Sequence, residues 1–177
     1  MDPRIDREAL DDLFAATYEE LRRLASAVSR GDSAGVSPTT LVNEAWMKLA
    51  ASRPFRSTSR LHFKRIAARA MRQVLVEAAR RRHAAKRGGD DAIFVTFDES
   101  AEHAASTAAE LLALNVALDD LARIEPRQAA MVESRFFGGL DVAETAALLD
   151  VSEATVLRDW RTAKAWLAAQ IARTRID

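Results

Sequence analysis

The sequence of 177 residues contains no cysteine, six glycines and a single tyrosine, and its 26 lysines and arginines are balanced by 26 aspartates and glutamates. Without cysteine the chain has no disulfide scaffold, no thiolate metal site and no cysteine nucleophile. No apolar run approaches the roughly 18 residues of a membrane-spanning helix, and the charged N-terminus does not resemble a signal peptide. These absences predict a cytoplasmic protein without membrane insertion.

The ingredients of a catalytic or metal site are also scarce. The three histidines, His62, His83 and His103, lie far apart, and the sequence has neither a His-Glu-x-x-His motif nor a glycine-rich phosphate loop. Two of these histidines are more simply part of a basic helix face. We therefore expect a protein that is not an enzyme and that has no metal site and no cofactor.

The balanced total charge hides a strong polarity along the chain. Residues 1–87 carry 18 basic and 10 acidic side chains, residues 88–110 carry six acidic and no basic ones, and residues 111–177 carry 8 basic and 10 acidic ones. Within the first segment, residues 48–87 hold 13 basic side chains and one acidic residue, Glu77. Such a block is typical of a surface that binds a polyanion.

Helix-forming residues dominate and apolar residues recur every three or four positions, so the sequence predicts an all-α fold. We expect helices at about residues 7–29, 38–49, 61–83, 110–121, 126–137, 142–149 and 153–171. Charge and composition divide them into two small helical domains, residues 1–87 and 111–177, joined by a flexible acidic linker at residues 88–110. The apolar island Ile93–Phe97 within the linker fits a short strand, a tether packed on a domain or a partner-binding segment.

One expected helix combines an inward apolar stripe with a basic ridge. The stripe consists of Phe63, Ile66, Ala67, Ala70 and Val74. At about 100° per residue, a set of basic residues falls within about 80° on a different side of the helix, namely Arg65, Arg69, Arg72, Arg80 and His83. This geometry suits a helix that follows the phosphates of a nucleic acid.

The last two expected helices, separated by a short turn, form a helix-turn-helix pattern. Asp150 takes the turn position that requires tolerance of a positive φ, and Ser152 caps the final helix. One face of that helix is apolar, with Val156, Trp160, Ala163 and Leu167. The opposite face carries Ala154, Arg158, Arg161 and Ala165, which allow close approach to a major groove and contacts to base edges or phosphates. Ser152, Glu153 and Thr155 lie at its N-terminus, where backbone N–H groups meet phosphate.

Three segments resemble the extracytoplasmic-function (ECF) sigma factors, small members of the sigma-70 family of bacterial RNA polymerase subunits. They are Leu41-Val42-Asn43-Glu44-Ala45-Trp46, the basic helix from His62 to Arg69, and the stretch from Thr155 to Arg161. The resemblance covers about residues 8–170. It implies a sigma factor that binds core RNA polymerase and directs promoter-specific transcription initiation, with region two in residues 1–87 and region four in residues 111–177.

The resemblance also implies a partner for each surface. The helix from Thr40 to Leu49 would bind the clamp helices of the largest polymerase subunit through Asn43, Glu44, Trp46 and Lys48. The loop at residues 52–60 and the helix after it would recognise and melt the -10 element through Arg56, Arg60, His62, Phe63, Arg65, Arg69 and Arg72. Region four would bind the polymerase flap and read the -35 element through Ser152, Glu153, Thr155, Arg158 and Arg161. The acidic linker would lie in the polymerase channel. An anti-sigma factor is a further candidate partner. The protein would be associated with the nucleoid.

Two other classes of function remain open. A helix-turn-helix transcriptional regulator would bind operator DNA without acting as a polymerase subunit, and it would concentrate basic charge on the helix-turn-helix, whereas here residues 111–177 have a net charge of −2. A helical scaffold or sigma-sequestering protein would leave the arginine ridge and the outer face of the last helix unexplained.

Overall fold

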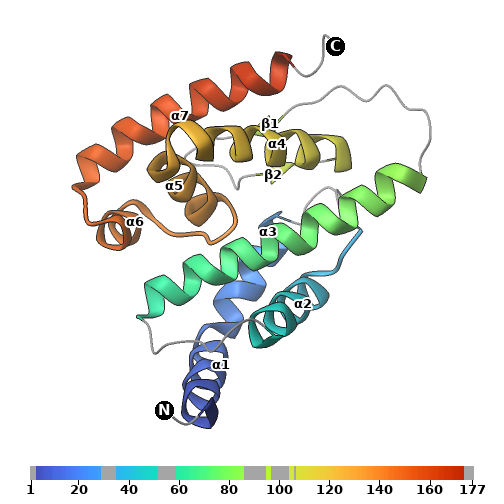
Figure 1. Ribbon diagram of the computed structural model, residues 1–177, viewed down its shortest axis with the longest axis vertical. Helices are drawn as coiled ribbons and strands as arrows, with labels where there is room; N and C mark the ends of the chain where they lie inside the picture. The colour runs from blue at the N-terminus through green and yellow to red at the C-terminus, as the bar shows by residue number, and fades with distance from the viewer. Residues whose placement is uncertain are drawn as a thin grey trace.

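The computed structural model describes residues 3–28, 35–51, 59–85, 95–96, 104–105 and 107–173, which form helices and one short pair of strands (Figure 1). The N-terminal lobe consists of α1 (Pro3–Val28), α2 (Pro38–Ala51) and α3 (Arg60–Ala85). The C-terminal lobe consists of α4 (Ala108–Ile124), α5 (Pro126–Phe136), α6 (Val142–Leu149) and α7 (Glu153–Arg173). The predicted all-α fold is confirmed. Within the described ranges, none of the helices has the length and apolar character needed to cross a membrane.

Helix α4 begins earlier than its apolar stripe indicates, because a polar cap precedes it. The Thr107 hydroxyl accepts a hydrogen bond from the Glu110 backbone N–H at 3.1 Å, and Glu110 Oε2 accepts one from the Thr107 N–H at 3.0 Å. This reciprocal pair satisfies two backbone donors that the first turn of a helix leaves unpaired. Glu110 is buried, so one of the six acidic side chains counted in the linker belongs to a helix cap instead.

The apolar island contributes a short strand. Strand β1 (Val95–Thr96) pairs antiparallel with β2 (Ala104–Ala105). Of the three interpretations of the segment at residues 93–97, the structure supports two for residues 95–96, the short strand and the tether packed on a domain. Both strands contact α4, and β2 also contacts α1, so the strand pair touches both lobes.

Helix α3 is the element that the two lobes share. It runs through the middle of the molecule, with α1 and α2 on one side and α4 and α5 on the other (Figure 1). Buried apolar residues from both lobes join into one continuous core. The predicted division into two domains did not anticipate this contact between the lobes, and the boundaries of the two domains stay a prediction.

The C-terminal lobe is centred on Trp160 of α7, which has no exposed surface. Around it α4, α5 and α7 contact one another pairwise. The guanidinium of Arg135, on α5, lies over the Trp160 ring at 4.3 Å from its centroid, a distance at which a cation is attracted to the face of an aromatic ring. Trp160 is therefore a packing residue, as its position on the inner face of α7 predicts.

The turn between α6 and α7 depends on a residue in the left-handed conformation. Asp150 has φ 54° and ψ 50°, as the sequence predicts for this position. Left-handed backbone costs a residue with a Cβ about 1–2 kcal/mol, and aspartate tolerates it better than most. We expect Asp150→Gly to stay within about 0.5 kcal/mol of the wild-type free energy of unfolding, and Asp150→Val to lower it by about 1–2 kcal/mol. Urea denaturation measures both, and equal stability of the two variants would contradict the assignment.

Candidate nucleic-acid interface

Two polar caps fix the helix-turn-helix formed by α6 and α7. Asp141 Oδ1 accepts a hydrogen bond from the Glu144 N–H at 2.7 Å, and Glu144 Oε2 accepts one from the Asp141 N–H at 3.1 Å. At the start of α7, Ser152 Oγ accepts a hydrogen bond from the Thr155 N–H at 3.2 Å and lies 2.9 Å from Thr155 Oγ1. The predicted cap by Ser152 is confirmed, and Asp141 caps α6 in the same way. Two hydroxyls therefore sit together at the N-terminus of α7, an arrangement suited to a phosphate.

Helix α7 has one inner and one outer face, with the residues that the sequence predicts on each. The inner face consists of Val156, Trp160, Ala163 and Leu167, none more than 1% exposed. The outer face consists of exposed residues, namely Glu153, Ala154, Arg158, Arg161 and Ala165. Because small side chains flank the arginines, the outer face can approach a DNA groove closely.

A buried carboxylate next to the outer face was not predicted from the sequence. Asp159 is 7% exposed, and its Oδ2 accepts a hydrogen bond from Arg127 Nη2 at 2.8 Å. Its Oδ1 lies 3.6 Å from the Nε of Arg158. Asp159 therefore connects the first turn of α5 with an arginine of the outer face. The partner Arg127 is 32 residues away, so sequence alone offers no signal for this contact.

The candidate residues that precede and begin α3 have different environments. Arg56 lies outside the described residues. Arg60 is exposed, and its Nη2 lies 2.9 Å from Glu20 Oε2. His62 and Arg69 are exposed, and Arg65 is half-buried. Arg65 and Arg69 form the accessible part of the predicted basic ridge at this end of α3, and His62 is an exposed candidate beside them.

Phe63 does not belong to this surface. It is 0% exposed and lines a small apolar pocket together with Phe14, Trp46 and Met71. A ring that is enclosed by the core of the N-terminal lobe has no surface with which to contact a base. The prediction of Phe63 as a DNA contact is therefore corrected, and its place in the apolar stripe of α3 gives its role.

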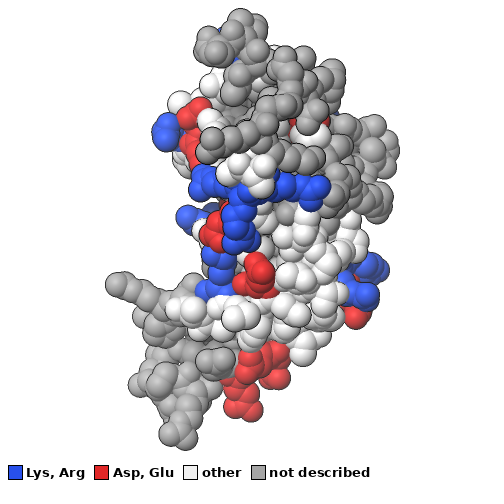
Figure 2. All heavy atoms as spheres, turned by 90° about the vertical axis from the view of Figure 1, so that its right-hand side faces the viewer, with Lys and Arg blue, Asp and Glu red and all other residues white. Residues whose placement is uncertain are grey.

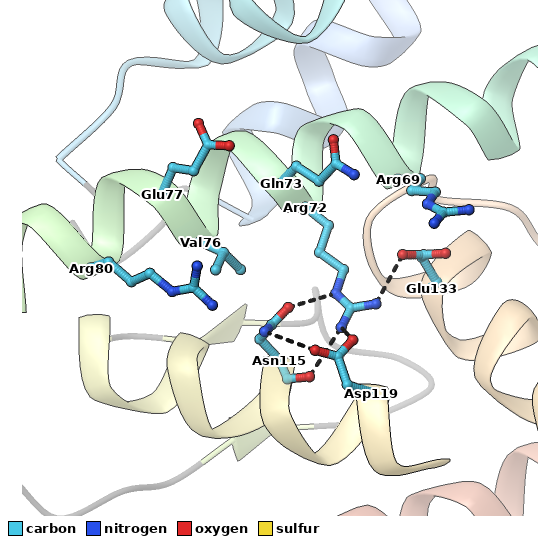
Figure 3. A pocket seen from close by; sticks show the side chains of 9 residues that line it. All are labelled: Arg69, Arg72, Gln73, Val76, Glu77, Arg80, Asn115, Asp119 and Glu133. Atoms are coloured by element: carbon cyan, nitrogen blue, oxygen red, sulfur yellow. Dashed lines mark hydrogen bonds and ion pairs between the residues drawn. The ribbon is translucent and has the colours of Figure 1, made fainter. Parts of the chain in front are cut away.

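Arg72 is the centre of a polar network that joins the two lobes (Figure 3). Its Nε donates a hydrogen bond to Asn115 Oδ1 at 3.0 Å, and its Nη2 donates to the Asn115 backbone oxygen at 3.0 Å. The same guanidinium contacts Asp119 Oδ1 at 2.7 Å and Glu133 Oε1 at 3.0 Å. Asn115 and Asp119 lie on α4 and Glu133 lies on α5. Four of the five N–H groups that a guanidinium offers therefore have partners in the C-terminal lobe.

A groove of about 260 Å³ follows this network along the seam between the lobes. Its lining residues are Arg69, Arg72, Gln73, Val76, Glu77, Arg80, Asn115, Asp119 and Glu133. Arg69 and Arg80 reach toward opposite ends of the groove, with Arg72 between them (Figure 3). On the face of the molecule shown in Figure 2, lysines and arginines gather in a band across the middle, and acidic side chains lie next to it.

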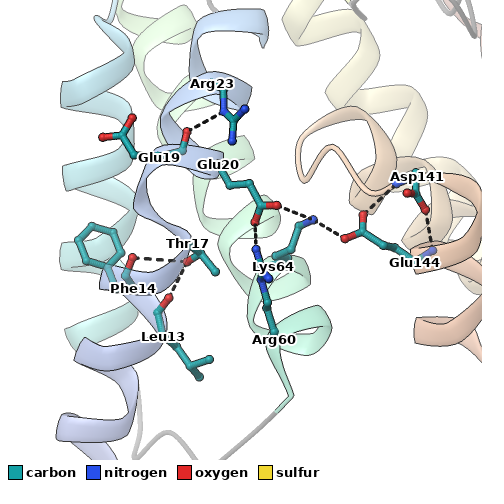
Figure 4. A network of polar contacts seen from close by, with 10 residues as sticks. All are labelled: Leu13, Phe14, Thr17, Glu19, Glu20, Arg23, Arg60, Lys64, Asp141 and Glu144. Carbon is teal, nitrogen blue, oxygen red and sulfur yellow. Dashed lines mark hydrogen bonds and ion pairs between the residues drawn. The ribbon is translucent and has the colours of Figure 1, made fainter.

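Lys64 forms a second contact between the lobes (Figure 4). Its side chain is 3% exposed, and its Nζ lies 2.9 Å from Glu144 Oε1 of α6 and 3.9 Å from Glu20 Oε1 of α1. A buried ammonium is tolerated only with such partners. Lys64 could not be identified from the sequence, because a lysine within a basic segment gives no sign that it is buried.

Of the candidate polymerase-binding residues on α2, two are exposed to solvent and two contact neighbouring helices. Asn43 and Glu44 are exposed. The ring of Trp46 is half-buried and stacks on Phe14 with a centroid distance of 4.4 Å. Lys48 Nζ lies 2.9 Å from Glu77 Oε1 of α3.

Met47 is a further exposed residue of this face and was not among the residues predicted from the sequence. Its exposed fraction is 68%, although its side chain is apolar. It follows Asn43 by four positions and Glu44 by three, which places all three on one side of the helix. This spacing is the signal that identifies it.

A helix-turn-helix with an outward arginine face, together with a second basic helix, defines a DNA-binding protein of transcription. The sequence profile of the family described as ECF sigma factor matches residues 5–173. No curated protein and no solved structure gives a significant match. The chain belongs to the ECF sigma factor family, whose members act with core RNA polymerase in promoter-directed transcription.

Proposed function

We propose that this sigma factor recognises a two-part promoter, with α7 reading the -35 element and α3 acting at the -10 element. The observation that carries the proposal is the outer face of α7, where Arg158 and Arg161 are exposed between small residues while the opposite face is fully buried. Two arginines held on a rigid helix have the geometry of base or phosphate contacts in a major groove. The capped first turn adds the Ser152 and Thr155 hydroxyls and exposed Glu153 at the edge of this face.

The -10 element would meet the exposed part of the α3 ridge. Arginines there hold the phosphate backbone, and bases of the opened strand are read singly by the loop that precedes α3. Unstacking a base costs a few kcal/mol, which contacts in a pocket offset. His62, Arg65 and Arg69 are the described residues that offer such contacts, whereas Arg72 reaches DNA only when its partners on α4 and α5 release it.

The exposed side of α2 would bind the clamp helices of the largest polymerase subunit. Asn43 and Glu44 provide polar contacts there, and Met47 provides an apolar centre. Trp46 would contact the clamp helices through the exposed part of its ring. Lys48 would contact them once its ion pair with Glu77 is broken. The C-terminal lobe would bind the flap of the polymerase. The acidic linker would occupy the positively charged RNA channel. An anti-sigma factor would act by covering the polymerase-binding surfaces of the two lobes.

Run-off transcription tests the proposal. Purified bacterial core polymerase is incubated with a library of genomic promoters, with and without this protein, and the transcript starts are sequenced. We expect starts that depend on the protein and share two spaced upstream elements. If no start depends on it while the protein alone binds duplex DNA, the function is that of a helix-turn-helix regulator that acts without the polymerase.

The role of Arg158 gives a specific expectation within the same assay. Arg158→Ala should cost about 1–3 kcal/mol of discrimination, roughly a 5- to 150-fold change, at one base pair of the upstream element. The matched variant Arg161→Ala should affect a different base pair or act equally on all sequences. A uniform loss for Arg158→Ala would make it a phosphate contact, and an unchanged profile would remove it from the interface.

A further inference from the structure

A second helix places an arginine beside the outer face of α7. Arg127 is the second residue of α5, and α5 packs against α7. Its Nη2 lies 2.8 Å from Asp159 Oδ2, and Arg158 Nε lies 3.6 Å from the other oxygen of the same carboxylate. Because both guanidinium groups contact one carboxylate, they lie close together. The outer face of α7 therefore continues onto α5 through Asp159.

The exposure of these three side chains favours a surface that binds an anion. The Arg127 and Arg158 side chains are 51% and 67% exposed, whereas Asp159 is buried. The two arginines repel each other, and the carboxylate that both contact offsets this repulsion. An anion that approaches from solvent meets the two cations, because the carboxylate is almost entirely covered. Two arginines and one carboxylate therefore leave an excess positive charge at this edge of the outer face.

The contacts with Asp159 leave available the N–H groups that bind DNA. Arg158 contacts the carboxylate through Nε, so that its two terminal nitrogens remain for a base. A guanidinium recognises guanine through two N–H groups that bind O6 and N7 together. Arg127 contacts the carboxylate through Nη2 and keeps other N–H groups for a phosphate oxygen.

Asp159 also restricts the side chain that would read the base. An exposed arginine adopts many rotamers and loses this freedom when it binds. An ion pair that is already formed in the free protein reduces this loss. Arg161, the other arginine of the outer face, has no ion pair within the part of the chain that the structure describes. It therefore provides a comparison on the same helix.

We propose that Arg127, Asp159 and Arg158 form one DNA-binding unit across two helices, in which Asp159 positions Arg158 for a base and Arg127 binds a phosphate. The inference rests on the function proposed above for α7, and it adds a DNA contact from outside the helix-turn-helix. Asp159 touches no DNA and is a positioning residue. Removing its charge affects the reading of one base pair, whereas removing Arg127 affects all sequences equally, because phosphates carry no sequence information.

The first test removes the charge of Asp159. Asp159→Asn keeps the shape of the side chain, and the matched control Asp120→Asn removes a carboxylate that pairs with Arg123 at the same distance, 2.8 Å. Each variant directs transcription with core polymerase from a library in which every base pair of the upstream element is varied. We expect Asp159→Asn to lose about two- to fivefold of the discrimination at the base pair that Arg158 reads, the size expected for a surface ion pair. Discrimination at all other base pairs, and the entire profile of the control, should be unchanged.

A double-mutant cycle shows whether Asp159 acts through Arg158. In the Arg158→Ala background, Asp159→Asn should cause no further loss of discrimination at that base pair. A merely structural role would instead lower transcription by the same factor for all upstream sequences. Circular dichroism shows that each variant is folded, and Asp159→Ser also removes the charge if Asp159→Asn does not fold. In a folded variant, a uniform loss, an unchanged profile or a loss that persists without the Arg158 side chain would overturn the positioning role.

The second test measures the phosphate contact of Arg127. Promoter binding by polymerase that contains each variant is titrated at several salt concentrations, because each phosphate contact adds to the slope of log K against log salt. We expect Arg127→Ala to reduce this slope by about 1 and to weaken binding equally for all upstream sequences. The matched control Arg123→Ala removes an exposed arginine that also pairs with an aspartate, on α4, and it should leave the slope unchanged. Equal slopes for the two variants would overturn the assignment of Arg127.

The outcomes separate the DNA-binding unit from the function on which it rests. The wild-type protein may direct starts that share an upstream element while Asp159→Asn keeps the wild-type profile and Arg127→Ala keeps the slope of its control. That result overturns the unit and leaves the reading of the -35 element by α7 intact. If no start depends on the wild-type protein, the proposed function fails and the unit fails with it.

Discussion

Replacing Trp160 by alanine is expected to lower the free energy of unfolding by about 3–5 kcal/mol, the range for removing a large aromatic side chain from a packed core. Trp160 is 0% exposed and lies where α4, α5 and α7 meet. The substitution leaves a cavity that the three surrounding helices cannot fill without moving. It also removes the ring beneath the Arg135 guanidinium, which then loses its attraction to the aromatic face.

Urea denaturation followed by circular dichroism measures this loss. The matched control is Trp166→Ala on the same helix, because Trp166 is only half-buried and should cost clearly less. A loss at Trp160 no larger than at Trp166 would contradict the central position of Trp160. Binding of Trp160→Ala to the proposed -35 element should weaken by the same factor for all DNA sequences. The reason is that packing of the inner face of α7 holds its outer face in position.

Phe63→Ala is expected to have a similarly large effect, about 3–5 kcal/mol of stability, because this ring is a fully buried part of the N-terminal core. It packs in the apolar pocket with Trp46 and Met71. Its neighbour His62 is exposed, so His62→Ala should change stability by less than about 0.5 kcal/mol. The two adjacent positions therefore separate a packing residue from a surface residue.

Phe63→Leu distinguishes packing from DNA recognition at this position. Leucine keeps most of the buried apolar volume, and we expect this variant to retain most of the stability and the promoter opening of the wild type. Permanganate footprinting of the opened promoter measures the second property. If Phe63→Leu folded normally but lost promoter opening, the role of Phe63 would be a contact with DNA and not packing alone.

The local features of the fold were predictable because they depend on neighbouring residues. Pro126 at the start of α5, Asp150 in the left-handed turn and Ser152 as a helix cap all follow from rules that span a few positions. The early start of α4 could also have been found, because Thr107 and Glu110 have the spacing of a capping box. The two faces of α7 followed from the helical period in the same way.

The seam was not predictable in this way, because its partners lie far apart in the sequence. Arg72 and Glu133 are separated by 61 positions, and Lys64 and Glu144 by 80. The apolar strip that faces the C-terminal lobe was present in the sequence as Ala68, Leu75, Val76 and Ala79. Two of its four members are alanines, which occur both in cores and on helix surfaces, so the pattern did not stand out. The basic ridge was correctly placed on α3, but its partial neutralisation required the structure.

The carboxylate of Glu144 takes part both in the N-terminal cap of α6 and in the ion pair between the two lobes. Its Oε2 accepts the backbone N–H of Asp141 at the start of α6, and its Oε1 contacts Lys64 of α3. A separation of the lobes would break only the second contact and would leave the cap of α6 intact. The helix-turn-helix would then meet the proposed promoter DNA as an ordered, rigid body. Its binding to DNA would then incur no entropy loss from folding. The affinity would depend on the loss of translational and rotational freedom and on the contacts with DNA.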